Sequence, residues 1–236
     1  MFHPDGQAFV ARVDAIEADG VFANLGRRLA GGALARFSGA LWRHGYEHLD
    51  VLGVALRFRD DDPEIARTLR GDQDLLFATI RSPFTMPFAP LTTNAHDYLD
   101  NRYWAVSPFD VQGVGRAKFR LSLVTPAVPS SLPREERLES TVASDLAVWR
   151  IEARRTFSFP WLPVATLTLK RVAKIDQEAL RFSPFHSGRG IVPRGLVHAI
   201  RKAAYDASQD ARPEHRERAT VARASHESEA RQNLQT

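Results

Sequence analysis

The sequence predicts an α+β protein in which a mostly antiparallel β-sheet closes into a barrel or stacks into a sandwich. Several short segments either alternate apolar and polar residues or are apolar throughout, which is typical of strands. Turn signals containing Gly, Pro and Asp separate these segments, and no regular strand–helix–strand spacing occurs. Many short strands without crossover helices favour a barrel or a sandwich, because both arrangements limit exposed sheet edges.

The predicted strands are short and spread over the first three quarters of the chain. They cover residues 8–16, 35–38, 51–58, 75–80, 116–124, 146–153 and 164–172. Period-two alternation marks most of them, whereas 51–58 and 75–80 are apolar runs typical of buried strands.

Fewer helices are expected. Residues 135–144 follow Pro133 and begin with acidic side chains, which suit the first turn of a helix. Residues 94–104 form a second predicted helix, and residues 195–211 form a third that is rich in alanine and stopped by Pro213. Beyond this point the apolar content falls. We therefore expect one domain over residues 1–212 and a charged, flexible tail over residues 213–236.

The charge pattern argues against a nucleic-acid partner. The net charge is +4, and the 32 basic residues, of which only four are lysines, are mixed with acidic ones along the chain. Nucleic-acid binders instead concentrate basic residues in a stripe or tail. The arginine excess suits an anionic cofactor, because guanidinium pairs well with carboxylates and phosphates.

Several other classes are excluded or disfavoured. The chain has no cysteine, so disulfides, thiolate metal sites, cysteine nucleophiles and thiolate-ligated haem are ruled out. It contains no phosphate-binding loop, dinucleotide fingerprint or nucleophile elbow. No apolar run is long enough for a transmembrane segment, and the first residues do not resemble a signal peptide, so a cytoplasmic protein is expected. His186 shows no metal-site spacing, and a solvated or capping role is expected for it.

The predicted C-terminal helix carries the most informative pair of side chains. Arg201 and Tyr205 stand four residues apart and therefore share one face of the helix, with Arg212 seven residues further on. A guanidinium beside a phenol favours the phenolate and lowers the phenol pKa, and phenolate oxygen is a donor suited to ferric iron. The alternative is an ordinary amphipathic helix whose tyrosine packs inward.

This helix is the last of several motifs that resemble those of the haem catalase superfamily in the same order. The motifs are His3/Gly6, Arg36-Phe37-Ser38, Asp50/Gly53/Ala55/Arg57/Phe58, Asp74-Leu75-Leu76 and Arg201/Tyr205/Ser208/Arg212. Residues 180–186 also resemble the segment that leads into the family's last helix. The resemblance implies a catalase-like antiparallel β-barrel with flanking α-helices, including a C-terminal helix that ligates haem iron.

The resemblance also implies roles for individual residues. Tyr205 is expected to bind the iron of haem b as its proximal ligand, with Arg201 keeping it a phenolate. His3 is expected to be the distal base, with Ser38 positioning its ring.

Two arginines are expected to bind the cofactor's edge. Arg36 and Arg212 would meet the haem propionates, and the barrel interior is expected to provide the apolar pocket.

The function that follows is a haem peroxidase acting on organic or lipid hydroperoxides or on hydrogen peroxide. The run after Asp74 continues Phe77-Ala78-Thr79 without the asparagine of large catalases, which favours the compact catalase-like peroxidases. A peroxide, an organic co-substrate and a second copy of the chain are the expected partners. Two alternatives stay open: a catalase-fold protein without peroxidase activity that binds haem or another apolar ligand, and a haem enzyme with different chemistry such as dehydration.

Overall fold

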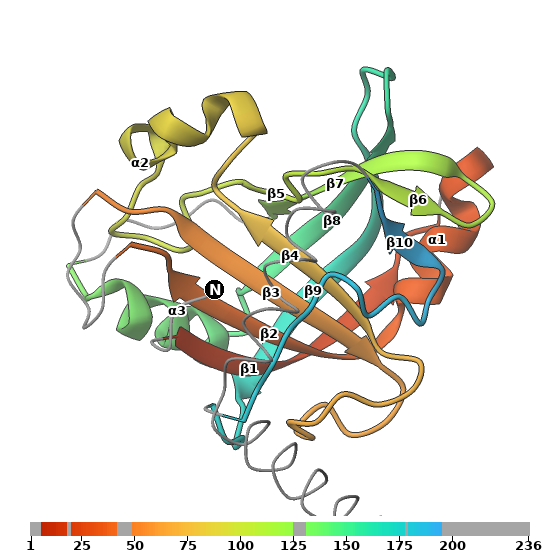
Figure 1. Ribbon diagram of the computed structural model, residues 1–236. Helices are drawn as coiled ribbons and strands as arrows, with labels where there is room; N and C mark the ends of the chain where they lie inside the picture. The colour runs from red at the N-terminus through yellow and green to blue at the C-terminus, as the bar shows by residue number, and fades with distance from the viewer. Residues whose placement is uncertain (1–5, 18–19, 42–48, 125–130, 178, 195–236) are drawn as a thin grey trace, which may run out of the picture. The chain divides into compact units, whose positions relative to one another are not determined.

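A computed structural model describes residues 6–17, 20–41, 49–124, 131–177 and 179–194, and its ten strands form one antiparallel sheet (Figure 1). The strands are β1 (Gly6–Ala15), β2 (Gly31–Gly39), β3 (Leu52–Arg59), β4 (Gln73–Ala78), β5 (Tyr103–Trp104), β6 (Phe109–Val111), β7 (Gly115–Leu123), β8 (Val148–Arg155), β9 (Leu162–Val172) and β10 (Ile191–Pro193). These residues belong to the compact unit Phe2–Arg194. The other unit, Met1 with Gly195–Thr236, lies outside the described residues.

Eight of the strands close into a barrel, which decides between the two predicted architectures. Following the hydrogen bonds around the barrel gives the order β1, β2, β3, β4, β5, β7, β8, β9, and β9 pairs again with β1. β6 pairs with one end of β7 and carries β10 on its other edge. All seven predicted strands are confirmed, and their alternation arises because successive side chains face the barrel core and the outside in turn.

Short helices flank the barrel, as expected. They are α1 (Ala23–Leu29), α2 (Ala89–Thr92) and α3 (Arg134–Ala143), with 3₁₀ turns at Gly20–Phe22 (η1) and Pro83–Phe88 (η2). The predicted helix at 135–144 is confirmed as α3, and α1 was not predicted. Figure 1 shows α1 and α3 at opposite ends of the barrel, where Leu25 and Leu29 of α1 and Leu138 and Val142 of α3 join the core. No helix in the described part of the chain is long and apolar enough to cross a membrane.

The helix predicted at residues 94–104 is wrong, because this stretch is an irregular loop that ends in β5. Its polar side chains bind the backbone in place of helical hydrogen bonds. Asp97 Oδ1 accepts from the Leu99 N–H at 2.8 Å, and Asn101 Oδ1 accepts from the Asn94 N–H at 3.1 Å. Asn and Asp compete with helix formation in this way.

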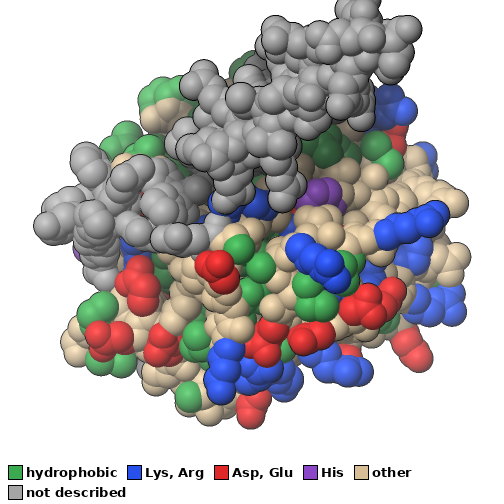
Figure 2. All heavy atoms as spheres, turned by 60° about the horizontal axis from the view of Figure 1, so that its bottom comes forward, with side chains coloured by type: hydrophobic (Ala, Val, Ile, Leu, Met, Phe, Trp, Pro, Cys, Tyr) green, Lys and Arg blue, Asp and Glu red, His purple; other side chains and the backbone are tan. Residues whose placement is uncertain are grey.

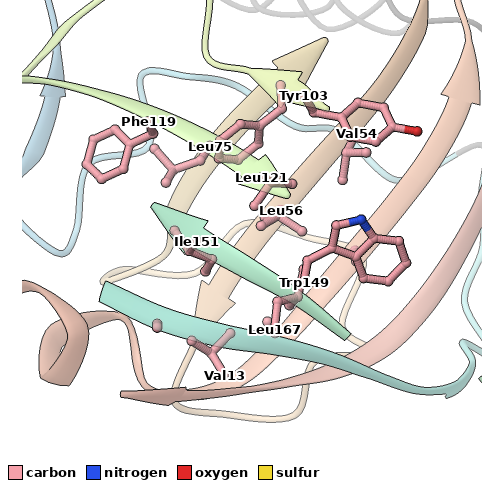
Figure 3. Close-up of a cluster of buried hydrophobic side chains, with 14 of the residues drawn as sticks. Val13, Val54, Leu56, Leu75, Tyr103, Phe119, Leu121, Trp149, Ile151 and Leu167 are labelled. Carbon is pink, nitrogen blue, oxygen red and sulfur yellow. The ribbon is translucent and has the colours of Figure 1, made fainter. Parts of the chain in front are cut away.

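The barrel interior is filled by a single hydrophobic cluster (Figure 3). Phe37 lies among aromatic neighbours, with ring centroids 5.4 Å from Trp149, 5.5 Å from Tyr98 and 6.4 Å from Tyr103. Burial raises the pKa of the Tyr103 hydroxyl well above its usual value, and this hydroxyl donates to the Tyr98 carbonyl at 2.7 Å. The interior is therefore a packed core rather than a chamber.

The outer surface of the barrel carries mixed charges on the face turned forward in Figure 2. Lys and Arg side chains lie among Asp and Glu side chains there, so neither sign dominates that face.

Candidate functional site

Two of the predicted site residues, Arg36 and Ser38, lie on the outer face of β2. Phe37 between them belongs to the core, and strand alternation therefore turns its two neighbours away from the interior. Both are nevertheless buried, with 8% of Arg36 and 4% of Ser38 exposed. A buried arginine and a buried serine on the outside of a barrel mark this face as more than a solvated surface.

The strand register aligns Ser38 with small residues on three neighbouring strands. Gly6 of β1 pairs with Ser38, Ser38 pairs with Gly53 of β3, and Gly53 pairs with Ala78 of β4. We call these four residues the small-residue row. It forms a low strip across four strands, on the face opposite the core.

Arg36 lies in the next row along the same strands, between Ala8 of β1 and Ala55 of β3. Its guanidinium lies against the Gly6 backbone: a Cβ atom on Gly6 would stand 2.8 Å from Arg36 Cζ and 2.7 Å from the Phe37 carbonyl oxygen. Only glycine leaves room for the guanidinium at this position.

Gly53 is different, because nothing described crowds its open side. A Cβ atom there would meet the Phe77 carbonyl oxygen and Ser38 Oγ at 3.7 Å, which is ordinary contact. The fold itself therefore tolerates alanine at this position.

The expectation that the barrel interior holds the cofactor is wrong. Phe9, Phe37, Tyr103 and Trp149 are among the side chains that occupy the interior, and each is at most 1% exposed. Of the residues that the motifs predicted for the site, the two that the structure describes, Arg36 and Ser38, lie on the opposite face of the same strands. The small-residue row and Arg36 fit a flat, apolar group with anionic edges better than the core does.

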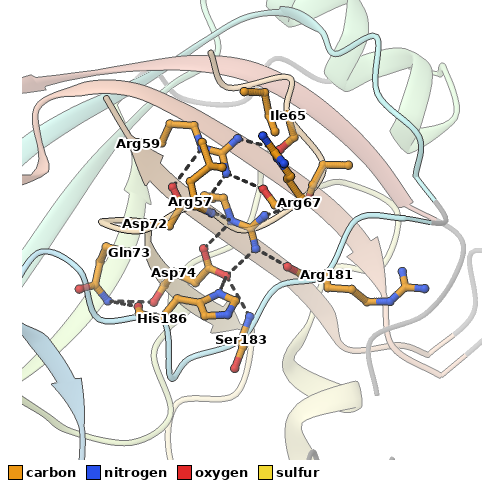
Figure 4. A network of polar contacts seen from close by, with 12 residues as sticks. Arg57, Arg59, Ile65, Arg67, Asp72, Gln73, Asp74, Arg181, Ser183 and His186 are labelled. Atoms are coloured by element: carbon orange, nitrogen blue, oxygen red, sulfur yellow. Dashed lines mark hydrogen bonds and ion pairs between the residues drawn. The ribbon is translucent and has the colours of Figure 1, made fainter. Parts of the chain in front are cut away.

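A network of buried ion pairs continues the outer face of β3 and β4 (Figure 4). Arg57 forms a two-pronged pair with Asp74, with Nε to Oδ1 and Nη2 to Oδ2 both at 2.9 Å, and neither side chain is exposed. Arg57 also donates to the Ala66 and Arg181 carbonyls and lies 4.9 Å from the centre of the Phe182 ring. The predicted Arg57 and Asp74 motif positions are thus partners of each other.

The second pair, Arg59 with Asp72, closes the loop between β3 and β4. Arg59 bonds Asp72 at 3.0 and 2.6 Å and donates to the carbonyls of Asp62, Ile65 and Arg67. Burial alone would raise the pKa of Asp72, but hydrogen bonds from Arg59 and the Leu69 N–H outweigh it and lower this pKa. Every N–H donor of the Arg59 guanidinium thus bonds an oxygen of the loop between β3 and β4.

His186 is neither solvated nor a simple cap, in contrast to the expectation for it. Its Nδ1 lies 2.8 Å from Asp74 Oδ2, and 29% of its side chain is exposed. The same carboxylate oxygen accepts from the Ser183 N–H at 2.9 Å, and Gln73 donates to the His186 carbonyl at 2.9 Å. The segment 180–191 is therefore fastened across the outer face of β3 and β4. The sequence signal for this network was Arg57 inside the apolar run 51–58, with Asp72 and Asp74 just before the run 75–80.

Asp50, another motif residue, has a structural role between β2 and β3. Its Oδ1 accepts from the N–H groups of Ala40, Leu41 and Val51 at 2.7–3.0 Å, and its Oδ2 lies 3.8 Å from Arg134 Nη1 of α3. A fully buried carboxylate held in this way fixes the start of β3.

The structure thus brings Arg36 and Ser38 together on one face. His3, Arg201, Tyr205 and Arg212 lie outside the described residues. Within the described ranges, no group of three His, Asp or Glu side chains is placed to hold a metal ion.

The comparisons with known proteins assign no family. No protein-family model matches the sequence, and no curated protein matches it either. Any functional conclusion therefore rests on the arrangement of the residues themselves.

Proposed function

We propose that the outer face of β1–β4 is the haem-binding face of a catalase-like peroxidase that acts on organic or lipid hydroperoxides or on hydrogen peroxide. One observation carries the proposal. Gly6, Arg36, Ser38, Gly53 and Ala55 are motif residues spread over 50 positions of the sequence, and they lie in two adjacent rows on one face. That face offers a flat floor of small residues with a guanidinium beside it.

Four residues of the chain would bind the cofactor. Arg36 would bind a propionate by a charge-assisted hydrogen bond, with Arg212 as its counterpart. Tyr205 would donate its phenolate oxygen to the iron, and Arg201 would hold the phenolate in that form. Bound haem would supply the redox-active iron at which the peroxide O–O bond breaks.

Proton movement would belong to a second group of residues. His3 would take a proton from one peroxide oxygen and return it to the other, and the Ser38 hydroxyl would orient its ring. The row position on β4 is Ala78, so Ser38 is the only hydroxyl in the small-residue row. This favours peroxidase chemistry over fast dismutation, which uses a further polar group near the peroxide.

The first experiment is the absorption spectrum of protein expressed with a haem precursor and purified without added cofactor. A Soret band at near-stoichiometric haem, with high-spin ferric bands, supports the proposal and is to be followed by hydroperoxide assays. A colourless protein that also rejects added hemin contradicts it and favours the alternative of an apolar-ligand carrier.

Two substitutions test the assigned roles. Tyr205→Phe is expected to lose haem or the phenolate charge-transfer feature of its spectrum. His3→Ala is expected to retain haem while peroxide consumption slows by about 100-fold, the usual scale for a positioned acid–base group. An unchanged spectrum in the first variant, or full activity in the second, removes that residue from the mechanism.

A third substitution tests the location of the cofactor. Gly53→Ala adds a methyl group that the apoprotein accommodates at 3.7 Å, so its unfolding midpoint should not change. If haem lies against the small-residue row, hemin affinity should fall about ten-fold or more, since overpacking by one carbon costs about 1–3 kcal/mol.

The matched control is Gly32→Ala, at the other end of the same face of β2, where a Cβ atom would lie 3.4 Å from the Arg59 carbonyl oxygen. Equal hemin affinity in both variants would place the cofactor elsewhere.

A further inference from the structure

The loop between β8 and β9 carries two phenylalanines whose side chains are almost entirely in solvent. Phe157 is 97% exposed and Phe159 is 91% exposed. Figure 1 shows this hairpin projecting beyond the barrel wall. Neither ring contributes to the core, so the fold gains little from having aromatic residues there.

Phe157 also has a backbone conformation that phenylalanine disfavours. Its φ is 70°, in the left-handed region where Gly and Asn are the usual residues. A large apolar side chain at this position is therefore not explained by the hairpin's own geometry.

Basic side chains surround the base of the hairpin. Lys118 of β7 stands directly opposite Arg154 of β8, and Ala117 next to it stands opposite Arg155. Like charges at opposed positions destabilise a sheet. Among the described residues, no acidic side chain forms an ion pair with Lys118, Arg154 or Arg155.

The acidic groups nearby are already engaged. Glu152 is bound by Arg120 at 2.7 and 3.0 Å, and Asp110 lies 2.6 Å from Arg194 and 4.0 Å from Arg116. The end of β7 and β8 that supports the hairpin therefore carries excess positive charge, in contrast to the mixed face of Figure 2.

The aromatic side chains of the hairpin tip and the basic side chains of the supporting strands line one surface hollow. The hollow has a volume of about 330 Å³, and its lining consists of Lys118, Arg154, Thr156, Phe157, Ser158 and Phe159. The ring of Trp161 contacts two guanidinium groups, and its centre lies 4.6 Å from Arg154, a lining residue, and 4.7 Å from Arg120. Apolar and cationic groups are thus within reach of one amphipathic ligand.

We propose that the β8–β9 hairpin docks the protein onto an anionic phospholipid surface. Phe157 and Phe159 insert among the acyl chains, while Lys118, Arg154 and Arg155 bind the phosphate groups. A second copy of the chain is a poorer occupant, because two hairpins would bring like charges together. A rigid protein partner is also disfavoured, because two projecting rings give far less than the roughly 800 Å² that a stable interface buries on each side.

This inference does not rest on haem binding, and apoprotein and haem-loaded protein should behave alike. The test is flotation with vesicles of phosphatidylcholine, with and without about 30% phosphatidylglycerol. Binding should require the anionic lipid and should weaken as salt is raised through the physiological range, because salt screens the basic side chains.

Two variants test the aromatic tip and the basic side chains separately. Phe157→Asn/Phe159→Ser should lower the partition coefficient about ten-fold or more at an unchanged thermal midpoint, since asparagine tolerates the conformation at position 157. Lys118→Gln/Arg155→Gln should lower binding to the anionic vesicles and reduce its salt dependence.

The matched control is Phe84→Ser/Phe88→Ser, which removes exposed aromatic rings from η2, a segment without basic residues. It should leave vesicle binding within about two-fold of wild type, because η2 itself carries no basic side chain to bind phosphate. An equal loss in this control, or no binding of wild type to anionic vesicles, overturns the proposal. Self-association that depends on the tip and occurs without vesicle binding also overturns it.

Discussion

Both faces of strands β1–β4 contain buried side chains, but only the outer face carries buried charges. The inner face carries Phe9, Phe37, Val54 and Leu75 into an apolar core. The outer face carries a guanidinium, a hydroxyl and, further along, two arginine–aspartate pairs with almost no exposure. The inner face is mainly apolar, whereas the outer face also buries charged groups, and its arginine–aspartate pairs are joined by hydrogen bonds.

The difference separates stability from specificity. Apolar packing inside the barrel is non-directional and would accept other side chains of similar volume. The outer network is directional: Asp74 binds Arg57, the Ser183 N–H and His186, which fixes where the segment 180–191 crosses the strands. A cofactor site needs this second kind of burial, because it depends on defined positions of charged groups.

The largest expected effect comes from breaking the outer network. Asp74→Ala leaves Arg57 buried without its partner, and the free energy of unfolding should fall by about 3–5 kcal/mol. Urea denaturation followed by far-ultraviolet circular dichroism measures this change.

The double variant Arg57→Leu/Asp74→Leu sharpens the comparison, because it gives the outer face the apolar character of the inner one. It should be more stable than Asp74→Ala alone, since no unpaired charge stays buried. If the double variant is the less stable of the two, the pair acts through more than charge compensation.

Acid should weaken the outer face while leaving the inner face unaffected. The pKa of Asp72 is lowered as described above. Burial would raise the pKa of Glu152, but hydrogen bonds from Arg120 and Ser122 outweigh it and lower that pKa as well. In the unfolded chain both groups titrate near about pH 4. Their contribution to the free energy of unfolding is therefore present above about pH 4. It is lost as the pH falls through the lowered pKa values of the folded state.

Urea midpoints at neutral pH and at about pH 3 measure this dependence. Asp72→Asn and Glu152→Gln should each reduce the loss of stability between neutral pH and about pH 3, because each removes one carboxylate whose pKa differs between the folded and unfolded states. If both variants lose as much stability at about pH 3 as wild type does, other groups cause the acid sensitivity.

The smallest effect is expected inside the barrel. Ile151 is fully buried, and Ile151→Val should lower the free energy of unfolding by about 0.5–1.5 kcal/mol. Hemin affinity should not change, because the proposed cofactor face is the outer one. A loss of hemin affinity in this variant would contradict the assignment of the two faces.

The strands could be predicted from the sequence because each has one face in the core. The failures have local causes. α1 was missed because glycines surround and interrupt it, and Gly26 within it is required by the close approach of the Val164 carbonyl oxygen. The helix at 94–104 was predicted wrongly because the spacing of apolar residues gives no information on hydrogen bonds between Asn or Asp side chains and the backbone.

The candidate site was predictable only in part. That Arg36 and Ser38 share a face follows from their spacing of two residues in a strand. That this face is the outer one depends on how the sheet closes, which no local pattern specifies. The alignment of Gly6, Ser38, Gly53 and Ala78 depends on strand register, and the contact of His186 with Asp74 joins segments 112 residues apart.

Closure of the barrel by β1 and β9 also has a consequence for the protein during its synthesis. Phe9 of β1 pairs with Val172 of β9, so one edge of the first strand has no partner until the ribosome has made almost all of the barrel. At about 5–20 residues per second, that edge stays open for on the order of ten seconds. The nascent chain carries an unpaired strand edge for this time, which makes the growing polypeptide, rather than the finished barrel, the form that most needs a chaperone.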